Sequence, residues 1–356
     1  MTTTTSVRGI THREVLDSNP RAGAVYGAPA NEWGPGHGSA AQLELSVGVR
    51  SVEEFPHLRL EHLAPTIGTV AHGLDITRVN AAEVGFLRQL LNARKVIFFR
   101  KQQCDERQHI AFGKHFGELE IHPFNPMHID HDEIIPVYSG KRSVGGANRW
   151  HSDVMWRMQP SLGSILRAKV VPELGGDTLF ADMGAAYRGL SADVRAQITG
   201  LMALNSGSAN GSKEKARHRL EERGATAQKL ANFDHTYAHI PIPLHPVVRT
   251  HPETGERILY VNGSFTRRIC GLDEGESKAL LNHLIAQAAI PEYQCRFRWA
   301  PDSVAFWDNR ACQHYASSDY WPAKRQMDRV TVAGDLPFFR DDDGNLTHTV
   351  ASDITQ

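Results

Sequence analysis

Two histidines and one aspartate are the side chains of this sequence best suited to hold a metal ion. His151 and Asp153 are separated by one residue, and on a strand residues i and i+2 face the same side. His314 lies far downstream and could supply a third ligand. A set of two histidines and one carboxylate can hold iron(II) on one face and leave the remaining positions open for a cosubstrate and O2. The pair alone is weak evidence, because the chain has 19 histidines.

Two arginines further along the chain could bind an anion. Arg325 and Arg329 are four residues apart, so on a strand both would point to the same side as Met327 and Thr331. An arginine directed into the interior of a barrel is costly unless an anion pairs with it, and a carboxylate is its natural bidentate partner. A Gly-Gly-Asp-Thr run ends at Thr178 and supplies a tight turn followed by a hydroxyl. Composition alone would favour two surface arginines, and the run that ends at Thr178 could be a simple hairpin.

Short strands must position these groups. Asn80 could cap a helix, and a second helix is expected over 105–116, where Asp105 and Gln108 have the spacing of a capping box. Further helices are expected at 184–199 and 274–289. Strands are predicted over 95–100, 134–138, 164–171, 178–181, 246–250, 257–262, 294–299, 303–307 and 329–333. Many short strands with few helices predict a mostly β fold, a sandwich or jelly roll with helices packed outside.

The composition divides the chain into unequal parts. Residues 1–57 are rich in Thr, Gly, Pro, Ala and Ser, so we expect a poorly ordered or surface-draped extension. Residues 58–340 form the expected catalytic domain, and 341–356 a C-terminal tail. Within the domain, 205–240 combines a Gly/Ser/Asn run with a charged helical stretch. A lid over a site and a solvated loop both fit that segment.

The charge balance excludes several classes of protein. The chain has 356 residues, with 39 basic and 40 acidic side chains, which argues against a nucleic-acid binder and against a basic membrane-surface protein. The longest apolar stretches are far shorter than the ~20 residues that span a bilayer. None of the four cysteines forms a CxxC pair and the N-terminus lacks the pattern of a signal peptide, so we expect a cytoplasmic protein.

Several motifs occurring in one order resemble a known family. The chain is similar over 58–340 to the taurine dioxygenase and alkylsulfatase family of iron(II)- and 2-oxoglutarate-dependent oxygenases. The resemblance rests on His122-Pro123, Asn148–Val154, Gly175–Phe180, His245–Pro252, Trp307–His314 and Arg325–Arg329. It implies a double-stranded β-helix, a cupin-like jelly roll with flanking helices.

The same resemblance implies a role for individual residues. The family's iron ligands fall on His151, Asp153 and His314. Its arginine and threonine for the distal carboxylate of 2-oxoglutarate fall on Arg325 and Thr178. The resemblance further implies that His122 and Arg329 lie near the substrate. Arg329 would also lie near the proximal carboxylate of 2-oxoglutarate.

The sequence departs from the taurine-oxidising pattern where the substrate would lie. Asn125 and Ala147 replace a tyrosine and an asparagine of those members, and Met155 and Trp156 replace a Thr and a Phe. Ala147, Met155 and Trp156 would offer apolar surface beside the iron. We therefore predict a larger, partly hydrophobic anion as the substrate in place of taurine.

The expected activity is oxidation, in the first place hydroxylation, of an unactivated carbon with release of succinate and CO2. Hydroxylation next to a heteroatom could cleave a C–S or C–O bond, as in the sulfonate and alkylsulfatase members. The expected partners are this small anionic substrate and further copies of the chain, as a homo-oligomer. One alternative is hydroxylation or desaturation of an intermediate in specialised metabolism. A zinc hydrolase on the same three ligands and a non-catalytic jelly-roll binding protein are alternatives of other classes.

Overall fold

The computed structural model describes residues 49–121, 130–140, 148–207, 212–222, 225–238 and 241–353. Two residues predicted to line the substrate pocket, His122 and Ala147, lie outside these ranges, as does Asn125. Of the predicted extension 1–57, the description begins at Val49.

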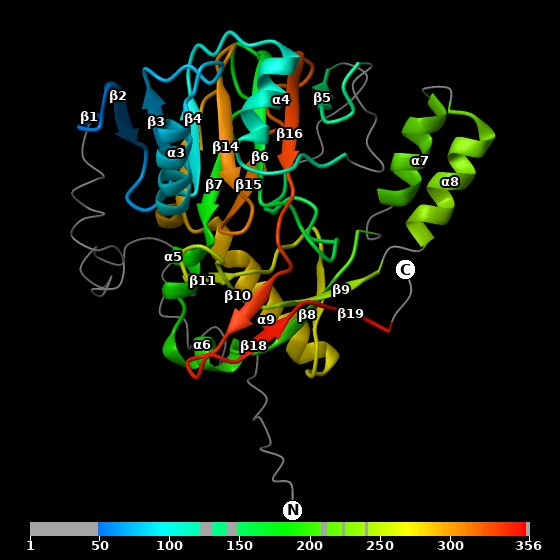
Figure 1. The fold of residues 1–356 in the computed structure, drawn as a ribbon. Helices are drawn as coiled ribbons and strands as arrows, with labels where there is room; N and C mark the ends of the chain where they lie inside the picture. The colour runs from blue at the N-terminus through cyan, green and yellow to red at the C-terminus, as the bar shows by residue number, and fades with distance from the viewer. Residues whose placement is uncertain are drawn as a thin grey trace, which may run out of the picture.

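A large sheet forms one wall of the molecule (Figure 1). All neighbouring strands in it are antiparallel except β3 and β4, which are parallel. In spatial order the strands are β1 (Val49–Val52), β2 (Phe55–His62), β3 (Thr69–His72), β4 (Val96–Phe99), β14 (Val304–Asp308), β6 (Gly163–Val170), β16 (Arg325–Val332) and β5 (Ile135–Ser139).

Two helices cover the outer face of this sheet (Figure 1). Helix α3 (Ala81–Arg94) begins at the predicted cap Asn80, whose side chain accepts from the backbone of Glu83 while Glu83 reaches back to Asn80. Helix α4 (Glu106–Lys114) begins with the predicted box of Asp105 and Gln108. Both boxes satisfy backbone N–H groups that a helix leaves unpaired in its first turn, which fixes where each helix begins.

A three-stranded sheet faces the inner side of the large one. Its order is β13 (Gln294–Phe297), β7 (Thr178–Asp182) and β15 (Cys312–Ala316). Apolar side chains from both sheets form one buried cluster between them, for example Phe98 and Met327 from the large sheet and Phe180 and Phe297 from the small one. Two sheets closed over one core are the predicted double-stranded β-helix, and the fold class is confirmed.

The remaining elements form a second cluster below the two sheets (Figure 1). The predicted helix at 184–199 is two helices, because α5 ends at Gly189 and the side chain of Ser191 caps α6. The elements are β8 (Met202–Asn205), β9 (Pro243–Pro246), β10 (Val248–Thr250), β11 (Arg257–Leu259), β12 (Thr266–Ile269), β17 (Phe338–Arg340), β18 (Leu346–His348), β19 (Val350–Ala351), α5 (Met183–Arg188), α6 (Ala192–Ile198), α9 (Glu274–Ala286), η2 (Gln287–Ala289) and η3 (Pro291–Tyr293).

Strand pairing moves both predicted domain boundaries. β1 and β2 pair with each other and β2 pairs with β3, so residues 49–57 belong to the large sheet and not to a separate extension. The predicted tail 341–356 is also wrong in part, because β18 pairs with β17 and β19 pairs with β9. The hydroxyl of Thr349 bonds to the ring of the buried His245. These C-terminal residues are therefore part of the domain.

Helices α7 (Ser212–Glu222) and α8 (Ala227–Ala238) form a pair at one side of the molecule, away from the two facing sheets (Figure 1). An ion pair joins them, with Arg217 Nε 3.1 Å from Asp234 Oδ2. They fall within the predicted lid segment 205–240. Among the residues that the structure describes, no helix has the length and apolar character needed to cross a membrane.

Candidate active site

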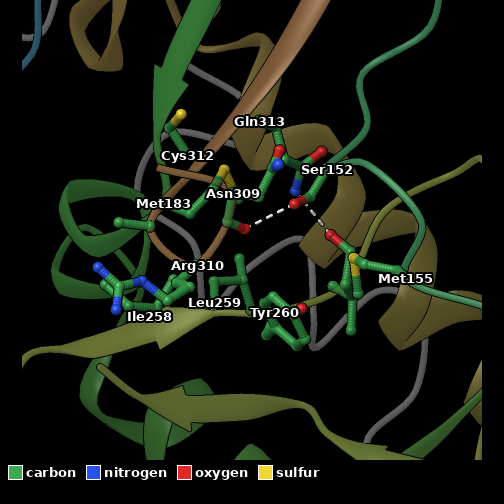
Figure 2. Close-up of a pocket in the computed structure, with 12 residues that line it drawn as sticks. Ser152, Met155, Met183, Ile258, Leu259, Tyr260, Asn309, Arg310, Cys312 and Gln313 are labelled. Carbon is green, nitrogen blue, oxygen red and sulfur yellow. Dashed lines mark hydrogen bonds between the residues drawn. The ribbon is translucent and has the colours of Figure 1, made fainter. Parts of the chain in front are cut away.

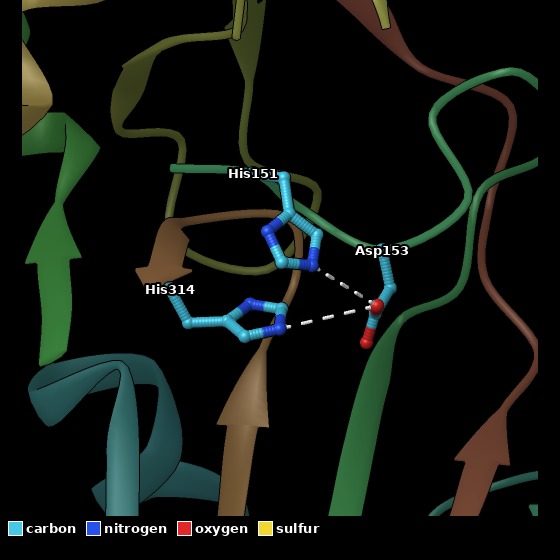
Figure 3. Close-up of side chains that lie close together, drawn as sticks. All are labelled: His151, Asp153 and His314. Atoms are coloured by element: carbon cyan, nitrogen blue, oxygen red, sulfur yellow. Dashed lines mark ion pairs between the residues drawn. The ribbon is translucent and has the colours of Figure 1, made fainter. Parts of the chain in front are cut away.

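His151, Asp153 and His314 converge at one end of the two facing sheets (Figure 3). The Nε2 atoms of both histidines lie 3.9 Å from Asp153 Oδ1. One ligand atom from each residue lies within 4.8 Å of the other two. Two nitrogens and one carboxylate oxygen at this spacing suit a single divalent transition metal bound on one face.

The chain reaches this geometry by a bridge and a turn. His151 and His314 exchange two backbone hydrogen bonds, with N–O distances of 3.1 and 2.8 Å, as an isolated antiparallel bridge. Asp153 then lies in a turn, and the next residue, Val154, has a φ of 49°. The expectation that His151 and Asp153 share one face of a strand is therefore wrong. The bridge holds His151 against β15, and the turn brings Asp153 round to both histidines.

Buried hydrogen bonds fix both oxygens of the Asp153 carboxylate. Ser164 Oγ donates to Oδ2 at 2.7 Å, and Arg329 Nη1 donates to Oδ1 at 2.9 Å. The Asn309 side chain ties the turn to β14, since its Oδ1 accepts from the backbone N–H of Asp153 and from the indole of Trp307. The carboxylate is thus oriented before any ion binds, with Oδ1 toward the histidines.

The electrostatics of the site keep Asp153 and His314 in the protonation states that a metal needs. Burial alone would raise the pKa of Asp153, but the charge of Arg329, with smaller effects of the histidines and of the Ser164 hydrogen bond, holds that pKa well below its usual range. Burial, reinforced by the neighbouring His151, lowers the pKa of His314 to about 3. Asp153 is therefore ionised and His314 neutral near pH 7, so each has an electron pair to offer.

Arg325 is a buried cation that forms no salt bridge with any residue that the structure describes. Its exposed fraction is 4%, and its Nε and Nη2 have no hydrogen-bond partner. Burial lowers its pKa, yet a guanidinium remains charged in proteins. Near it, Thr178 opens β7 and accepts a hydrogen bond from Trp299. Because an unpaired buried charge is costly, the cluster suits an anion that supplies the missing acceptors.

Of the three apolar residues predicted for the substrate pocket, the structure describes Met155 and Trp156, which lie in different surroundings. Met155 is 1% exposed, and its side chain lines a small cavity with Tyr260 and Asn309 (Figure 2). Its sulfur lies 2.7 Å from Asn262 Nδ2. Met155 therefore packs in the protein interior, and its contact with substrate stays a prediction. Trp156 is half-buried, with the Arg157 guanidinium carbon 5.2 Å from its ring centre.

A family model described as "Taurine catabolism dioxygenase TauD, TfdA family" matches residues 59–331. The chain belongs to this family. It is an alpha-ketoglutarate-dependent (2-oxoglutarate-dependent) dioxygenase with a His/Asp/His metal site. The resemblance drawn from the sequence is confirmed.

Relatives within the TauD/TfdA family cover most of the chain. An alpha-ketoglutarate-dependent sulfate ester dioxygenase of Pseudomonas putida is 34% identical over 83% of this chain and 96% of its own. An alpha-ketoglutarate-dependent sulfonate dioxygenase of Saccharomyces cerevisiae is 32% identical over 80% of this chain and 69% of its own. The crystal structure of a taurine dioxygenase from Burkholderia xenovorans superimposes with a TM-score of 0.68 at 34% identity, covering 84% of this chain and 97% of that one.

Sequence patterns did not reveal every residue that shapes this dioxygenase site. Ser164 and Trp299 were not singled out, because each acts through a partner more than ten residues away in the sequence. Asn309 likewise bonds to a distant partner, because its side chain accepts from the backbone N–H of Asp153, 156 residues away in the sequence. A serine on a strand next to an HxD motif carries no sequence signal of its own.

Proposed function

We propose that this chain is an iron(II) enzyme that oxidises a small organic anion at the carbon bearing its sulfate or sulfonate group. His151, Asp153 and His314 would hold the iron, and Arg325 with Thr178 would hold the distal carboxylate of 2-oxoglutarate. When bound, iron(II) with 2-oxoglutarate and O2 supplies the oxidant that replaces a C–H hydrogen by hydroxyl, and 2-oxoglutarate leaves as succinate and CO2.

The single observation that carries the proposal is the buried guanidinium of Arg325, whose Nε and Nη2 have no hydrogen-bond partner among the described residues. Zinc hydrolysis needs three ligands and a water but no dicarboxylate cosubstrate, so it leaves Arg325 without a purpose. A non-catalytic jelly-roll binding protein would need neither the buried Arg325 nor the oriented carboxylate of Asp153. An enzyme that binds a dicarboxylate beside a metal explains both features.

The protein's own part is to bind, orient and exclude water. Ser164 and Asn309 hold Asp153 in one orientation. Arg329 also faces Asp153 and is the residue we assign to the proximal carboxylate or to the anionic head of the substrate. We assign Trp156, together with His122 and Ala147, to the substrate side. α7 and α8, within 205–240, would close over the pocket as a lid.

The substrate class is supported by the names of several relatives, which refer to organic anions. They include a sulfonate dioxygenase, a sulfate ester dioxygenase, an alkylsulfatase and a phenoxypropionate dioxygenase. Hydroxylation of the carbon next to a sulfate ester oxygen gives an unstable product that splits into an aldehyde and hydrogen sulfate. The same step beside a sulfonate gives an aldehyde and hydrogen sulfite. A longer apolar chain adds about 25 cal/mol of binding free energy per Å² buried.

A screen of matched anions tests this proposal. Purified protein with iron(II), 2-oxoglutarate and O2 would be given hexyl sulfate, hexanesulfonate, phenoxyacetate or taurine, and succinate and aldehyde would be measured together. We expect coupled succinate and aldehyde with a hexyl substrate, and much less with taurine. Equal or better turnover of taurine would contradict the proposed preference, and succinate with a hydroxylated but uncleaved product would favour an oxidation of specialised metabolism.

A further inference from the structure

Trp299 joins the two side chains that we assign to the distal carboxylate of 2-oxoglutarate. Its indole Nε1 donates to Thr178 Oγ1 at 2.9 Å. The guanidinium carbon of Arg325 lies 5.8 Å from the centre of the indole ring, within the range of a cation–π contact. All three side chains are buried. Trp299 therefore contacts both parts of the proposed carboxylate site.

Packing holds the indole in place independently of any ligand. Trp299 follows β13, whose last residue Phe297 pairs directly with Thr178 on β7. The rings of Phe297 and Trp299 meet edge to face, with centroids 5.0 Å apart and an interplanar angle of 87°. Phe297 in turn stacks on Phe98 of the large sheet at 3.9 Å. A ring fixed from the sheet side can hold its N–H toward Thr178 without help from the cosubstrate.

The hydrogen bond from Trp299 determines what the Thr178 hydroxyl can do. A threonine hydroxyl has one proton to donate and two lone pairs to accept. An indole can only donate, so the Thr178 oxygen is the acceptor and its own proton remains for another acceptor. Among the described residues, no hydrogen bond uses that proton. Arg325 Nε and Nη2 also lack acceptors, and the Arg325 side chain passes beside Gly176, two residues before Thr178.

We infer that Trp299 is a positioning residue for the cosubstrate: its indole N–H fixes the Thr178 hydroxyl as a donor to the carboxylate that Arg325 binds. This inference rests on the proposed roles of Arg325 and Thr178. Without the indole N–H the hydroxyl would be free to rotate, and part of the hydrogen bond to the carboxylate would be lost on average. The loss of the indole N–H would therefore weaken the binding of 2-oxoglutarate only through its distal carboxylate.

Calorimetry with Trp299→Phe tests the inference. Protein loaded with Mn(II), a redox-stable stand-in for iron(II), would be titrated with 2-oxoglutarate. We expect the Kd of 2-oxoglutarate to rise about three- to ten-fold, the range for weakening one hydrogen bond to a charged group, while the Kd of Mn(II) stays unchanged. An unchanged Kd of 2-oxoglutarate would overturn the inference.

Two controls separate positioning from general packing. In the Thr178→Val background, Trp299→Phe should cause no further loss of 2-oxoglutarate affinity, because the hydroxyl is already absent. Affinity for 2-oxopentanoate, in which a methyl group replaces the distal carboxylate, should be the same with and without Trp299→Phe. An equal loss in the Thr178→Val background, or with 2-oxopentanoate, would show that the ring acts only through packing and would overturn the inference.

Two further measurements keep the result interpretable. If Trp299→Phe lowers the thermal midpoint so far that it cannot be titrated, benzothienylalanine at position 299 replaces the N–H by sulfur at nearly the same size and should give the same loss. Arg325→Gln would be titrated in parallel. If Arg325→Gln weakens 2-oxoglutarate and Trp299→Phe does not, the inference is wrong and the proposed function stands. If neither variant weakens 2-oxoglutarate, the proposed cosubstrate site is wrong as well.

Discussion

Asp153 shows how single residues prepare the metal site. Its Oδ2 is occupied by the Ser164 hydroxyl, whereas Oδ1 faces both histidines and Arg329. Only Oδ1 is therefore placed to bind an ion, as one ligand atom and not two. Hydrogen-bond partners that orient a metal ligand commonly change metal affinity by roughly ten- to a hundred-fold when they are removed.

Replacing Ser164 by alanine tests that role. The variant leaves Asp153 Oδ2 without its donor, so the carboxylate can rotate and the affinity for Fe(II) or Mn(II) should fall roughly ten- to a hundred-fold. Metal titration under anaerobic conditions measures the change. Ser161→Ala is the matched control, because Ser161 donates to Glu120 and not to Asp153. Equal metal affinities in both variants and the wild type would refute the role of Ser164.

Replacing Arg325 by glutamine tests the carboxylate site. The loss of a charge-assisted pair, typically about 1.5–3 kcal/mol, should weaken 2-oxoglutarate roughly ten- to a hundred-fold and leave metal affinity unchanged. Arg296→Gln is the control, since Arg296 bonds to Asp177 at the surface of the same small sheet. Unchanged 2-oxoglutarate binding by Arg325→Gln would count against the assignment.

At the scale of elements, the small sheet sets the spacing between the two proposed ligand sites. His314 on β15 lies opposite Phe180 on β7, and Thr178 lies two residues before Phe180, opposite Ala316. The metal ligand and the carboxylate ligand are therefore fixed by the register of one strand pair. A shift of one residue would turn each side chain to the other face.

Local signals in the sequence predicted elements well, and long-range pairing was harder to predict. Helices α3 and α4 begin where Asn80 and Asp105 predicted, because a capping box is complete within four residues. β1, β2 and β19 were missed, because each is defined by its partner strand more than by its own pattern. The types of the three metal ligands were predictable. The bridge and turn that bring them together were not.

The pair of helices α7 and α8 supports a prediction about motion. We expect amide hydrogen exchange across both helices to slow when 2-oxoglutarate and an anionic substrate bind, because the segment 205–240 would close over the site. Exchange measured by mass spectrometry with and without ligands checks this, and helix α9 serves as an internal control. Equal exchange of α7 and α8 in both states would contradict a lid.

At the scale of the whole molecule, the fold buries several histidines in neutral form. Burial, together with the charge of Arg167, lowers the pKa of His109 to about 4, and burial lowers the pKa of His245 to about 3. Their ring nitrogens bond to Ile165 O and to Thr349 and Met155, respectively. These histidines link helix α4 and the C-terminal strands to the core. The expected cytoplasmic location and homo-oligomeric assembly stay predictions.

This burial predicts how stability depends on pH. Below about pH 6.5 the unfolded chain takes up a proton on His109, whereas the folded protein does so only near pH 4. The free energy of unfolding should therefore decrease as the pH is lowered from about 6.5 to about 4, by roughly 1.4 kcal/mol per pH unit for this residue. Urea unfolding at pH 6.5, 5.5 and 4.5 measures the slope. His109→Gln should flatten it by about that amount, and an identical slope in the variant would contradict the prediction.

The measurement that tests the central claim most directly is succinate release on admission of O2 to anaerobic protein that holds iron(II), 2-oxoglutarate and an alkyl sulfate. The account predicts that the wild type releases succinate only when iron(II), 2-oxoglutarate and O2 are all present. It predicts that Asp153→Ala retains no iron(II) and releases none. Full turnover of the substrate with zinc alone, in the absence of 2-oxoglutarate, would contradict the account and favour a hydrolase.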